Sequence, residues 1–437
     1  MPLSNGQTGD KRAQANNPMR FFHHAWVRVS ALTLLFPFGL IIFLTGLNVT
    51  RDSGAGDPFR ADAIPANAPF QSLTYSVHTS LWWDDGLTVG TYMDWVQLMS
   101  FTHIKQVFAW QEIEPERGRW EFEIGDRMIE GLERRGLQIV ARLSDAPDWA
   151  HPSLPPVDDG SYIDSPPDNL ADYATFCGTV AEHYRGRIAA YQIWNEPNLT
   201  REWGNRPPNA ADYVALLRVC SEAIRAVDPD AILISAGLAP TGGLTDGAGV
   251  QLAIPDDVYF QAMYDSTFQS AVDVVGVHAP GYEFPAYGSD DAERDGRGRW
   301  ATFRRVEDLR RIMVANNDAP RQMAILEMGY TTDQVNPSYQ WYAVNEYDQA
   351  RLIVEAYQYA AQHWRPWVGL MNVIYIADPE WTSQDEQFWW SINDPALGFT
   401  RPAFAALVQM PKYCGAVVIP ARSPEESAFA LADNPCN

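Results

Sequence analysis

Eight short apolar runs, separated by amphipathic segments, most restrict how this 437-residue chain can fold. A strand that is covered on both faces appears in sequence as a short and nearly continuous apolar run, so each of the eight predicts a buried strand. They are SLTYSVH (72–78), IKQVFAW (104–110), LQIVARL (137–143), IAAYQIW (188–194), AILISAG (231–237), VDVVGVH (272–278), QMAILEM (322–328) and GLMNVIYI (369–376).

Helical patterns lie between the predicted strands. Apolar residues recur at helical spacing at Leu170, Tyr173, Phe176, Cys177, Val180 and Tyr184, and again at Tyr213, Leu216, Leu217, Cys220, Ile224 and Val227. Eight strands alternating with helices predict an α/β fold in which a parallel sheet closes as a (β/α)8 or TIM barrel. A doubly wound open sheet is the alternative. It is disfavoured because no GxGxxG or GxxxxGK[ST] motif follows an early strand.

The first 70 residues differ in composition from the rest of the chain. Residues 31–49, ALTLLFPFGLIIFLTGLNV, carry no charge, and their length approaches the ~20 residues that cross a hydrocarbon core. Basic residues precede this run and none follows until Arg51, which predicts a cytoplasmic segment 1–30 and a transmembrane signal anchor 31–49. A cleaved signal peptide is the alternative, but the run is long for one. We expect a linker at 50–70, a barrel at 71–410 and a C-terminal tail at 411–437, with everything after residue 49 extracytoplasmic.

Charge and cysteine content exclude several classes of function. The formal net charge of -23 disfavours nucleic acid as a partner, because an acidic surface repels phosphates. The four cysteines show no metal-binding spacing, so we expect no metal site. In an exported domain, Cys414 with Cys436 could hold the tail, and Cys177 with Cys220 could bridge neighbouring helices. Buried unpaired thiols at Cys177 and Cys220 are an equally good interpretation.

Two of the predicted strands end in a glutamate. The fourth leads into Asn195-Glu196-Pro197, and the seventh contains Glu327 near its end. A structural explanation exists for the first, since Asn and Pro commonly end strands. However, the active site of such a barrel gathers at the C-terminal ends of its strands, so both carboxylates should meet at one mouth. Two facing carboxyl groups can flank a glycosidic bond, one to protonate the leaving oxygen and one to attack or to activate water.

These residues resemble those of glycoside hydrolase clan A, the retaining barrel enzymes. The likeness includes WNEP at the end of the fourth strand and the glutamate of the seventh. It extends to KQVFAWQEIEPERGRWEFE (105–123), similar to the strand 2 region of family 39-like β-xylosidases, and to YIADPEW (375–381) and FWWSINDPALGFTRPAF (388–404). The resemblance covers about residues 71–410.

The resemblance implies specific roles at the matching positions. Glu196 would be the acid/base, Glu327 the nucleophile, and Asn195 a partner of the sugar 2-hydroxyl. A retaining mechanism requires the two carboxyl groups to lie only ~5–5.5 Å apart, which makes their separation the structural test.

Other candidates for substrate binding follow the remaining strand ends. His278 and Tyr282 could support the nucleophile or contact the sugar, or they could be a core histidine and a loop tyrosine. Lys105 and Arg142 could face the barrel mouth or pair with an acid. Among the tryptophans after strand ends, Trp110, Trp149, Trp381 and Trp389, one or two could stack on sugars while the rest pack locally. Glu112 and Glu114 are expected to cap a helix or to pair locally.

The sequence therefore predicts a membrane-anchored, extracytoplasmic retaining glycoside hydrolase that acts on a carbohydrate without a metal or organic cofactor. A different class of function stays open, because a barrel fold does not require catalysis. The alternative is a glycan-binding or scaffolding ectodomain of a membrane complex. The presence of both Glu196 and Glu327 favours the enzyme, since a binding module has no need of two opposed carboxylates.

Overall fold

A computed structural model describes residues 68–83, 86–155, 164–395, 397–414 and 417–421. The predicted cytoplasmic segment 1–30 and transmembrane anchor 31–49 lie outside these residues, as do nearly all of the predicted linker and the end of the predicted tail. Among the helices of the described ranges, none combines the length and the apolar character that a membrane span needs.

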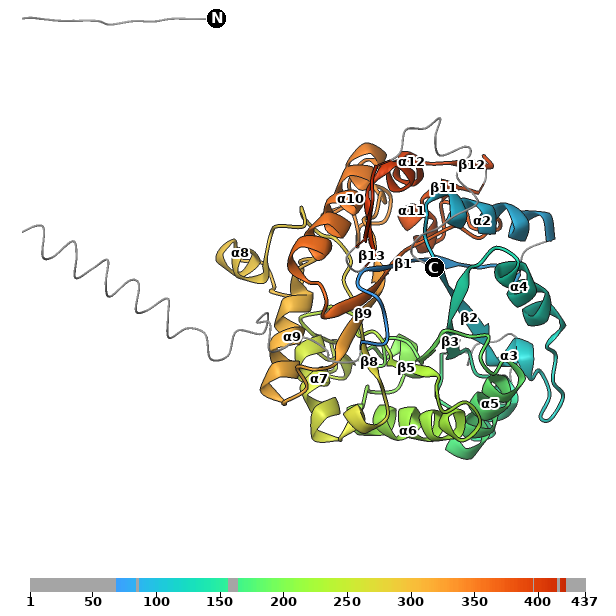
Figure 1. Cartoon of the computed structure of the whole chain (residues 1–437). Coiled ribbons are helices and arrows are strands. Elements are labelled where there is room, and N and C mark those ends of the chain that lie inside the picture. Colours follow the sequence, from blue (N-terminus) through green and yellow to red (C-terminus); the bar gives the residue numbers. More distant parts are fainter. Residues whose placement is uncertain (1–67, 84–85, 156–163, 396, 415–416, 422–437) are drawn as a thin grey trace, which may run out of the picture. The chain divides into compact units, whose positions relative to one another are not determined.

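Eight parallel strands form a closed barrel, as the eight apolar runs predict (Figure 1). The strands are β1 (Thr74–Thr79), β2 (His103–Ala109), β3 (Gln138–Ser144), β4 (Ala190–Ile193), β5 (Ile232–Ser235), β8 (Val274–His278), β9 (Gln322–Met328) and β10 (Val368–Val373). They follow one another around the barrel in chain order, and β10 pairs with β1 to close it. All eight strand predictions are therefore confirmed, with bounds that differ by a few residues at the ends.

Helices surround the barrel and cover the outer faces of its strands (Figure 1). The longer ones are α2 (Gly86–Leu98), α4 (Glu123–Glu133), α5 (Leu170–His183), α6 (Ala210–Val227), α7 (Asp256–Asp265), α9 (Arg305–Ala315), α10 (Glu346–His363) and α12 (Pro402–Gln409). Asn169, Asn209 and Asn345 begin three of them, and each side-chain oxygen accepts hydrogen bonds from the first backbone N–H groups. The buried apolar faces of these helices join the outer faces of the strands in one large core.

Shorter elements fill the connections. They are the helical turns α3 (Trp110–Ile113), α8 (Ser289–Arg294), α11 (Glu386–Trp390), η2 (Asp148–Ala150), η3 (Arg201–Trp203) and η4 (Phe268–Ser270), and the strands β6 (Leu244–Thr245), β7 (Gln251–Ala253), β11 (Asn393–Asp394), β12 (Phe399–Thr400), β13 (Lys412–Cys414) and β14 (Val417–Ile419). The strands β6 and β7, β11 and β12, and β13 and β14 pair as antiparallel hairpins.

Phe70 corrects the predicted boundary between linker and barrel. This residue is 4% exposed and packs into a second core cluster with inward-facing residues of the strands, among them Val140, Ile234 and Leu370. Its backbone N–H donates to Gln322 Oε1 over 3.0 Å, and its carbonyl accepts from Gln322 Nε2 over 3.1 Å. The domain thus includes residue 70, because the apolar ring fills the end of the barrel opposite the cavity described below.

The domain also continues past the predicted end at residue 410. Tyr413, in β13, accepts a hydrogen bond from the backbone N–H of Leu73 over 3.2 Å, and its own N–H donates to the Tyr75 hydroxyl over 3.0 Å. The β13–β14 hairpin therefore packs against the chain that enters β1 and belongs to the barrel domain.

A disulfide joins Cys177 on α5 to Cys220 on α6. The bridging interpretation of this pair is confirmed, and the interpretation as two unpaired thiols is wrong. Helices α5 and α6 flank β4, so the bond fixes the two helices beside the strand that leads to Glu196. Cys436 lies outside the described residues, and the predicted Cys414–Cys436 pair remains a prediction.

Candidate active site

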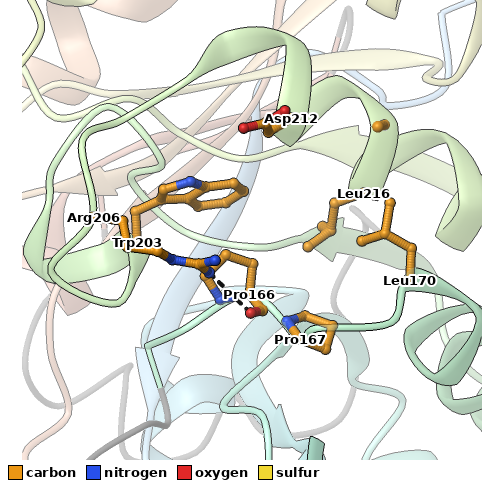
Figure 2. Close-up of a pocket in the computed structure, with 8 residues that line it drawn as sticks. Pro166, Pro167, Leu170, Trp203, Arg206, Asp212 and Leu216 are labelled. Carbon is orange, nitrogen blue, oxygen red and sulfur yellow. Dashed lines mark hydrogen bonds between the residues drawn. The ribbon is translucent and has the colours of Figure 1, made fainter. Parts of the chain in front are cut away.

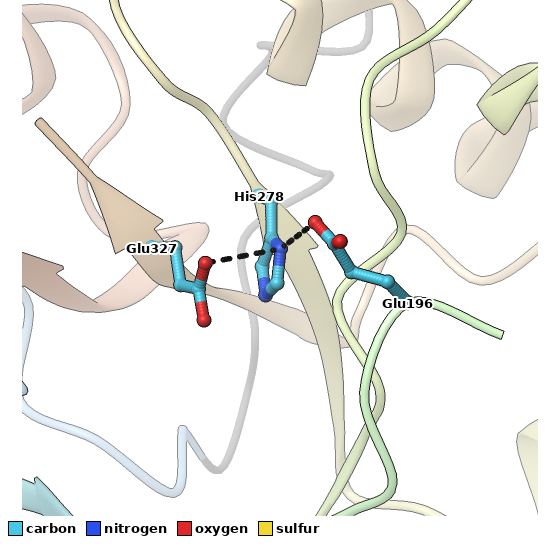
Figure 3. Close-up of side chains that lie close together, drawn as sticks. All are labelled: Glu196, His278 and Glu327. Carbon is cyan, nitrogen blue, oxygen red and sulfur yellow. Dashed lines mark hydrogen bonds and ion pairs between the residues drawn. The ribbon is translucent and has the colours of Figure 1, made fainter. Parts of the chain in front are cut away.

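Glu196, His278 and Glu327 lie together at the C-terminal edge of the barrel (Figure 3). Glu327 is a residue of β9, and His278 is the last residue of β8, where it pairs in register with Glu327. Glu196 follows β4 on the connecting loop. The parallel direction of all three strands is what brings their C-terminal ends to one side of the molecule.

The segment around Glu196 makes a tight turn after β4. Trp194 and Glu196 both have left-handed backbone conformations, with φ of 68° and 35°. The Glu196 N–H donates to the carbonyl of Gly237 over 3.1 Å. Asn198 then accepts from the Ala239 N–H over 3.0 Å and donates to the Ala239 carbonyl over 2.9 Å. These contacts with the loop after β5 stabilise the strained turn. They explain why the apolar strand β4 is followed by Asn-Glu-Pro.

His278 connects the two carboxylates. Its Nδ1 lies 2.8 Å from Glu196 Oε1 and 3.6 Å from Glu327 Oε2. One ring nitrogen of His278 and one carboxylate oxygen each of Glu196 and Glu327 all lie within 4.8 Å of one another. The two carboxylates are therefore close enough to act on one bond. Gly237 permits this arrangement, because a Cβ atom there would lie 2.1 Å from His278 Cδ2.

Lys105 lies beneath Glu327. Its Nζ is buried and lies 3.1 Å from Glu327 Oε1 and 3.2 Å from the Leu326 carbonyl. Burial alone would raise the pKa of Glu327, but His278, Lys105 and other nearby basic groups lower that pKa well below its usual range. The pKa of Lys105 is itself lowered to about 8 by burial, although Glu327 opposes the shift. Lys105 thus pairs with an acid, which is one of its two predicted interpretations, and it is not among the residues that line the cavity.

Asn195 and Arg142 also reach the site. The Asn195 oxygen faces Gln192 Nε2 at 3.4 Å, and its nitrogen donates to Glu202 Oε2 over 3.3 Å. Arg142 donates to the Ser144 hydroxyl over 3.0 Å and lies 3.4 Å from Asp145 Oδ1. Both side chains border the cavity in front of the two glutamates.

This cavity measures about 500 Å³. The predicted site residues on its wall are Arg142, Asn195, Glu196, His278, Tyr282 and Glu327. The sequence analysis missed further wall residues, namely Asp164, Arg201, Glu202, Tyr339, Tyr342, Tyr375, Glu386 and Trp390. Arg201 and Glu202 directly follow the NEPNLT segment, Asp164 lies in the connection after β3, and the others follow strands β9 and β10. Position after a strand end was therefore the signal that could have identified most of them.

The three missed carboxyl groups, Asp164, Glu202 and Glu386, all have raised pKa values. Burial, together with the nearby charge of Glu196, raises the pKa of Glu202 to about 8. Burial also raises the pKa values of Glu386 and Asp164. Arg201 lies between Glu196 and Glu202: its Nη2 is 3.4 Å from Glu196 Oε2 and its Nε is 3.7 Å from Glu202 Oε1. The cavity therefore combines an ionised carboxylate, Glu327, with carboxyl groups that hold a proton more readily.

The prediction that Trp110 contacts sugar is wrong. Its indole is fully buried, stacks on Phe176 and donates to Glu114 Oε2 over 2.7 Å. Glu114 also accepts from the Gly118 N–H over 2.7 Å, so this acid pairs locally, as expected. Trp381 is half-buried and packs edge-on against Tyr375, which borders the cavity, but it is not itself among the residues that line the cavity. The packing of helix α5 against α3, which sequence does not reveal, decides the burial of Trp110.

The same three side chains could in principle hold a cation, since Glu196, His278 and Glu327 offer one nitrogen and two carboxylate oxygens within 4.8 Å. Protein cations already compensate both carboxylates. Lys105 pairs with Glu327, and Arg201 lies beside Glu196. The donor set therefore fits acid–base and nucleophilic chemistry by the side chains themselves.

A second cavity of about 200 Å³ lies where α5 and α6 meet η3 (Figure 2). Its wall is formed by Pro166, Pro167, Leu170, Trp203, Arg206, Asp212, Ala215 and Leu216, and Arg206 donates to the Pro166 carbonyl over 3.0 Å. It contains one carboxylate rather than an opposed pair. The chemistry described above therefore belongs to the larger cavity.

Comparisons with known proteins agree with the barrel fold. The glycoside hydrolase family 42 model, described as beta-galactosidase, matches residues 83–161. A monomeric beta-xylosidase from Caulobacter crescentus is 17% identical, and the match covers 79% of this chain and 69% of that one with a TM-score of 0.55. A family 39 glycoside hydrolase from Bacteroides cellulosilyticus is 16% identical, with 78% and 63% coverage and a TM-score of 0.54. GH5_18 from Streptomyces cattleya is 15% identical, with 83% and 88% coverage and a TM-score of 0.56.

Comparison with curated protein sequences finds no match. This chain spans 63% of the length of the Bacteroides protein. At such identities the solved structures establish the barrel fold, while the family model adds a match in sequence. The predicted resemblance to barrel glycoside hydrolases of clan A is thereby confirmed.

Proposed function

We propose that this chain is a retaining glycoside hydrolase in which Glu196 is the general acid/base and Glu327 is the nucleophile. One observation carries the proposal: carboxylate oxygens of the two residues lie within 4.8 Å at the floor of a cavity of about 500 Å³. Retaining enzymes place their carboxyl groups ~5–5.5 Å apart, whereas inverting enzymes separate them by ~6.5–9.5 Å to admit a water. The close pair fits direct attack by one carboxylate.

In the first step, Glu327 attacks the anomeric carbon and forms a covalent bond to it. The bond to the leaving oxygen breaks, and Glu196 gives that oxygen its proton. In the second step, Glu196 takes a proton from water, the water oxygen attacks the anomeric carbon, and Glu327 leaves as a carboxylate. The enzyme returns to its starting state, and the configuration at the anomeric carbon is retained.

The charges around Glu327 support its role as nucleophile. His278 and Lys105 lower the pKa of Glu327, which keeps the carboxylate ionised when a sugar displaces water from the cavity. His278 Nδ1 lies beside both carboxylates. A proton on this nitrogen can therefore stabilise whichever of Glu196 and Glu327 is negatively charged at each step. Asn195 stands beside Glu196 with its orientation set by Gln192 and Glu202, which supports the implied contact with the sugar 2-hydroxyl.

We propose neutral β-linked pyranosides as the substrate class. Carboxyl groups on the cavity wall come from Asp164, Glu196, Glu202, Glu327 and Glu386, whereas its cations are Arg142 and Arg201. Both arginines already lie 3.4 Å from protein carboxylates, Arg142 beside Asp145 and Arg201 beside Glu196, so neither is free to pair with a sugar carboxylate. The names of the similar proteins, a beta-xylosidase and a beta-galactosidase family, suggest xylosides, glucosides and galactosides as the first compounds to test.

Export of the barrel domain is a further part of the proposal. A structural disulfide persists in oxidising compartments, and Cys177–Cys220 is such a bond. The uncharged run at 31–49 with basic residues before it supports a single membrane anchor.

The test is trapping of the covalent intermediate. The full-length protein is incubated with 2-deoxy-2-fluoro xyloside, glucoside and galactoside, and adducts are detected by intact mass and located by peptide mapping. Fluorine at C2 slows breakdown of the glycosyl-enzyme, so we expect one adduct on Glu327 that also identifies the sugar.

The control variants separate the nucleophile from its neighbours. Glu327→Gln should form no adduct, whereas Glu386→Gln, which alters another carboxyl of the same wall, should still form one. A folded wild-type protein that forms no adduct and hydrolyses no glycoside of the panel would contradict the proposal and favour the glycan-binding or scaffolding ectodomain.

A further inference from the structure

Tyr282 and Tyr342 continue the cavity wall into an exposed tryptophan. Both tyrosines border the cavity, and Tyr282 is 9% exposed. Trp341 lies on the outer side of Tyr282, with ring centroids 5.6 Å apart and ring planes inclined by 17°. Trp341 itself is open to solvent, because the residue is 51% exposed. One ring of this stack therefore faces the cavity and the next faces solvent.

Neighbouring aromatic rings hold Trp341 in place. Its centroid is 4.6 Å from that of Tyr342 and 6.4 Å from that of Trp300, both in edge-to-face arrangement. Trp300 is in turn seated against Gly242 and Gly298, where a Cβ would lie 2.7 Å and 2.2 Å from its indole nitrogen. The exposed indole thus belongs to a packed aromatic group and has little rotamer freedom left to lose on binding a ligand.

The loop that carries Trp341 is itself fastened at both ends. The Val344 N–H donates to the Thr331 carbonyl over 2.9 Å, and the Asp333 carboxylate accepts from the N–H groups of Val335 and Asn336 over 2.9 Å and 2.8 Å. The same loop supplies Tyr339 and Tyr342 to the cavity wall. The position of Trp341 relative to the catalytic carboxylates is therefore set by the fold.

We propose that Trp341 is a binding site for a second or third sugar ring of the substrate, so that the natural substrate is a chain of neutral β-linked pyranoses. A flat, preordered and half-exposed aromatic ring binds the apolar face of a pyranose, and continuity with Tyr282 and Tyr342 makes the occupant part of the same chain that enters the cavity. This inference rests on the proposed function, because it assigns the rest of the substrate to a surface beside that active site.

Calorimetric titration of the full-length protein tests the site independently of turnover. The background is Glu327→Gln, which should bind chains without cleaving them, and the probes are xylo- and cello-oligosaccharides of one to four rings. We expect affinity to rise about tenfold from one ring to three. In the same background, Trp341→Ala should lose most of that gain without weakening binding of the monosaccharide, and Trp341→Tyr should recover part of it.

Tyr347→Ala is the matched control, since Tyr347 is a 79% exposed aromatic residue on α10 that does not border the cavity. It should keep the full dependence on chain length. Length dependence that survives in Trp341→Ala, or the absence of any gain with either series, would overturn the inference.

Glycoside hydrolysis, measured on proteins that keep Glu327, separates this inference from the proposed function. Cleavage of short glycosides together with unchanged chain binding by Trp341→Ala would contradict only the sugar site. Chain binding that depends on Trp341, in a protein that cleaves nothing and forms no adduct, would contradict only the hydrolase.

Discussion

Lys105 Nζ lies 3.1 Å from Glu327 Oε1, and this buried pair links β2 to the candidate nucleophile on β9. Lys105 stabilises the ionised Glu327 carboxylate from the barrel interior, while the cavity lies on the other side of that carboxylate. Its consequence is a dependence of activity on pH that substitution of the lysine should change.

Lys105→Met should move the acidic limb of the pH profile of kcat/KM to higher pH. Without the cation, the Glu327 carboxylate is less stabilised, so the pKa of Glu327 rises. The nucleophile therefore becomes protonated at a higher pH. We expect a shift of at least one pH unit, equivalent to about 1.4 kcal/mol. Lys105→Arg keeps the charge and should leave the acidic limb in place. An unchanged limb in Lys105→Met would show that the pair does not control the nucleophile.

Glu202→Gln should become progressively more stable than the wild type as pH rises from 5 to 8. Burial raises the pKa of Glu202 to about 8, from an ordinary value of 4.5, so its protonated form is the one that the folded state favours. That contribution is complete below about pH 4.5 and is lost as pH rises through 8, whereas glutamine mimics the protonated form throughout. The difference should reach on the order of a few kcal/mol, since one unit of pKa corresponds to ~1.4 kcal/mol.

Urea unfolding at pH 5, 6.5 and 8 measures this difference. Glu222→Gln, an exposed glutamate on α6, is the matched control and should follow the wild type at each pH. Parallel curves for Glu202→Gln and wild type would contradict the raised pKa.

Gly237→Ala should lower both stability and activity. The added methyl group would lie 2.1 Å from His278 Cδ2, so the imidazole that contacts both carboxylates must move. Overpacking of this kind costs ~1–3 kcal/mol in the free energy of unfolding. Gly247→Ala is the control, because a Cβ there meets no atom within 4 Å. If Gly237→Ala retained the wild-type kcat/KM, the position of His278 would not matter to the reaction.

Loss of the Cys177–Cys220 bridge should destabilise the barrel without changing the site. The bond closes a loop with a sequence separation of 43 residues. The chain-entropy model assigns about 4 kcal/mol to a loop of this length. The double variant Cys177→Ala, Cys220→Ala should therefore melt at a lower temperature. A reducing agent should lower the Tm of the wild type but not that of the variant. Equal lowering of the Tm in both proteins would show that the reducing agent does not act through this disulfide.

Much of the fold was predictable because its signals are local. Each barrel strand is a short apolar run, and each covering helix shows its own apolar stripe, so the number and order of the elements follow from neighbouring residues. The parallel direction of the strands then places Glu196 and Glu327 at one mouth, since both follow the same end of their strands. Their residue types and flanking motifs also predicted a glycoside hydrolase.

The tertiary structure decided which side chains reach the cavity. Trp110 follows a strand end as Tyr375 does, yet packing against α5 buries it completely while Tyr375 forms part of the wall. Phe70 looked like part of a linker and instead fills one end of the barrel. Glu202 carries no motif of its own, and its raised pKa arises from burial and from Glu196. Burial and charge depend on contacts between residues far apart in sequence, and those contacts exist only once the barrel has closed.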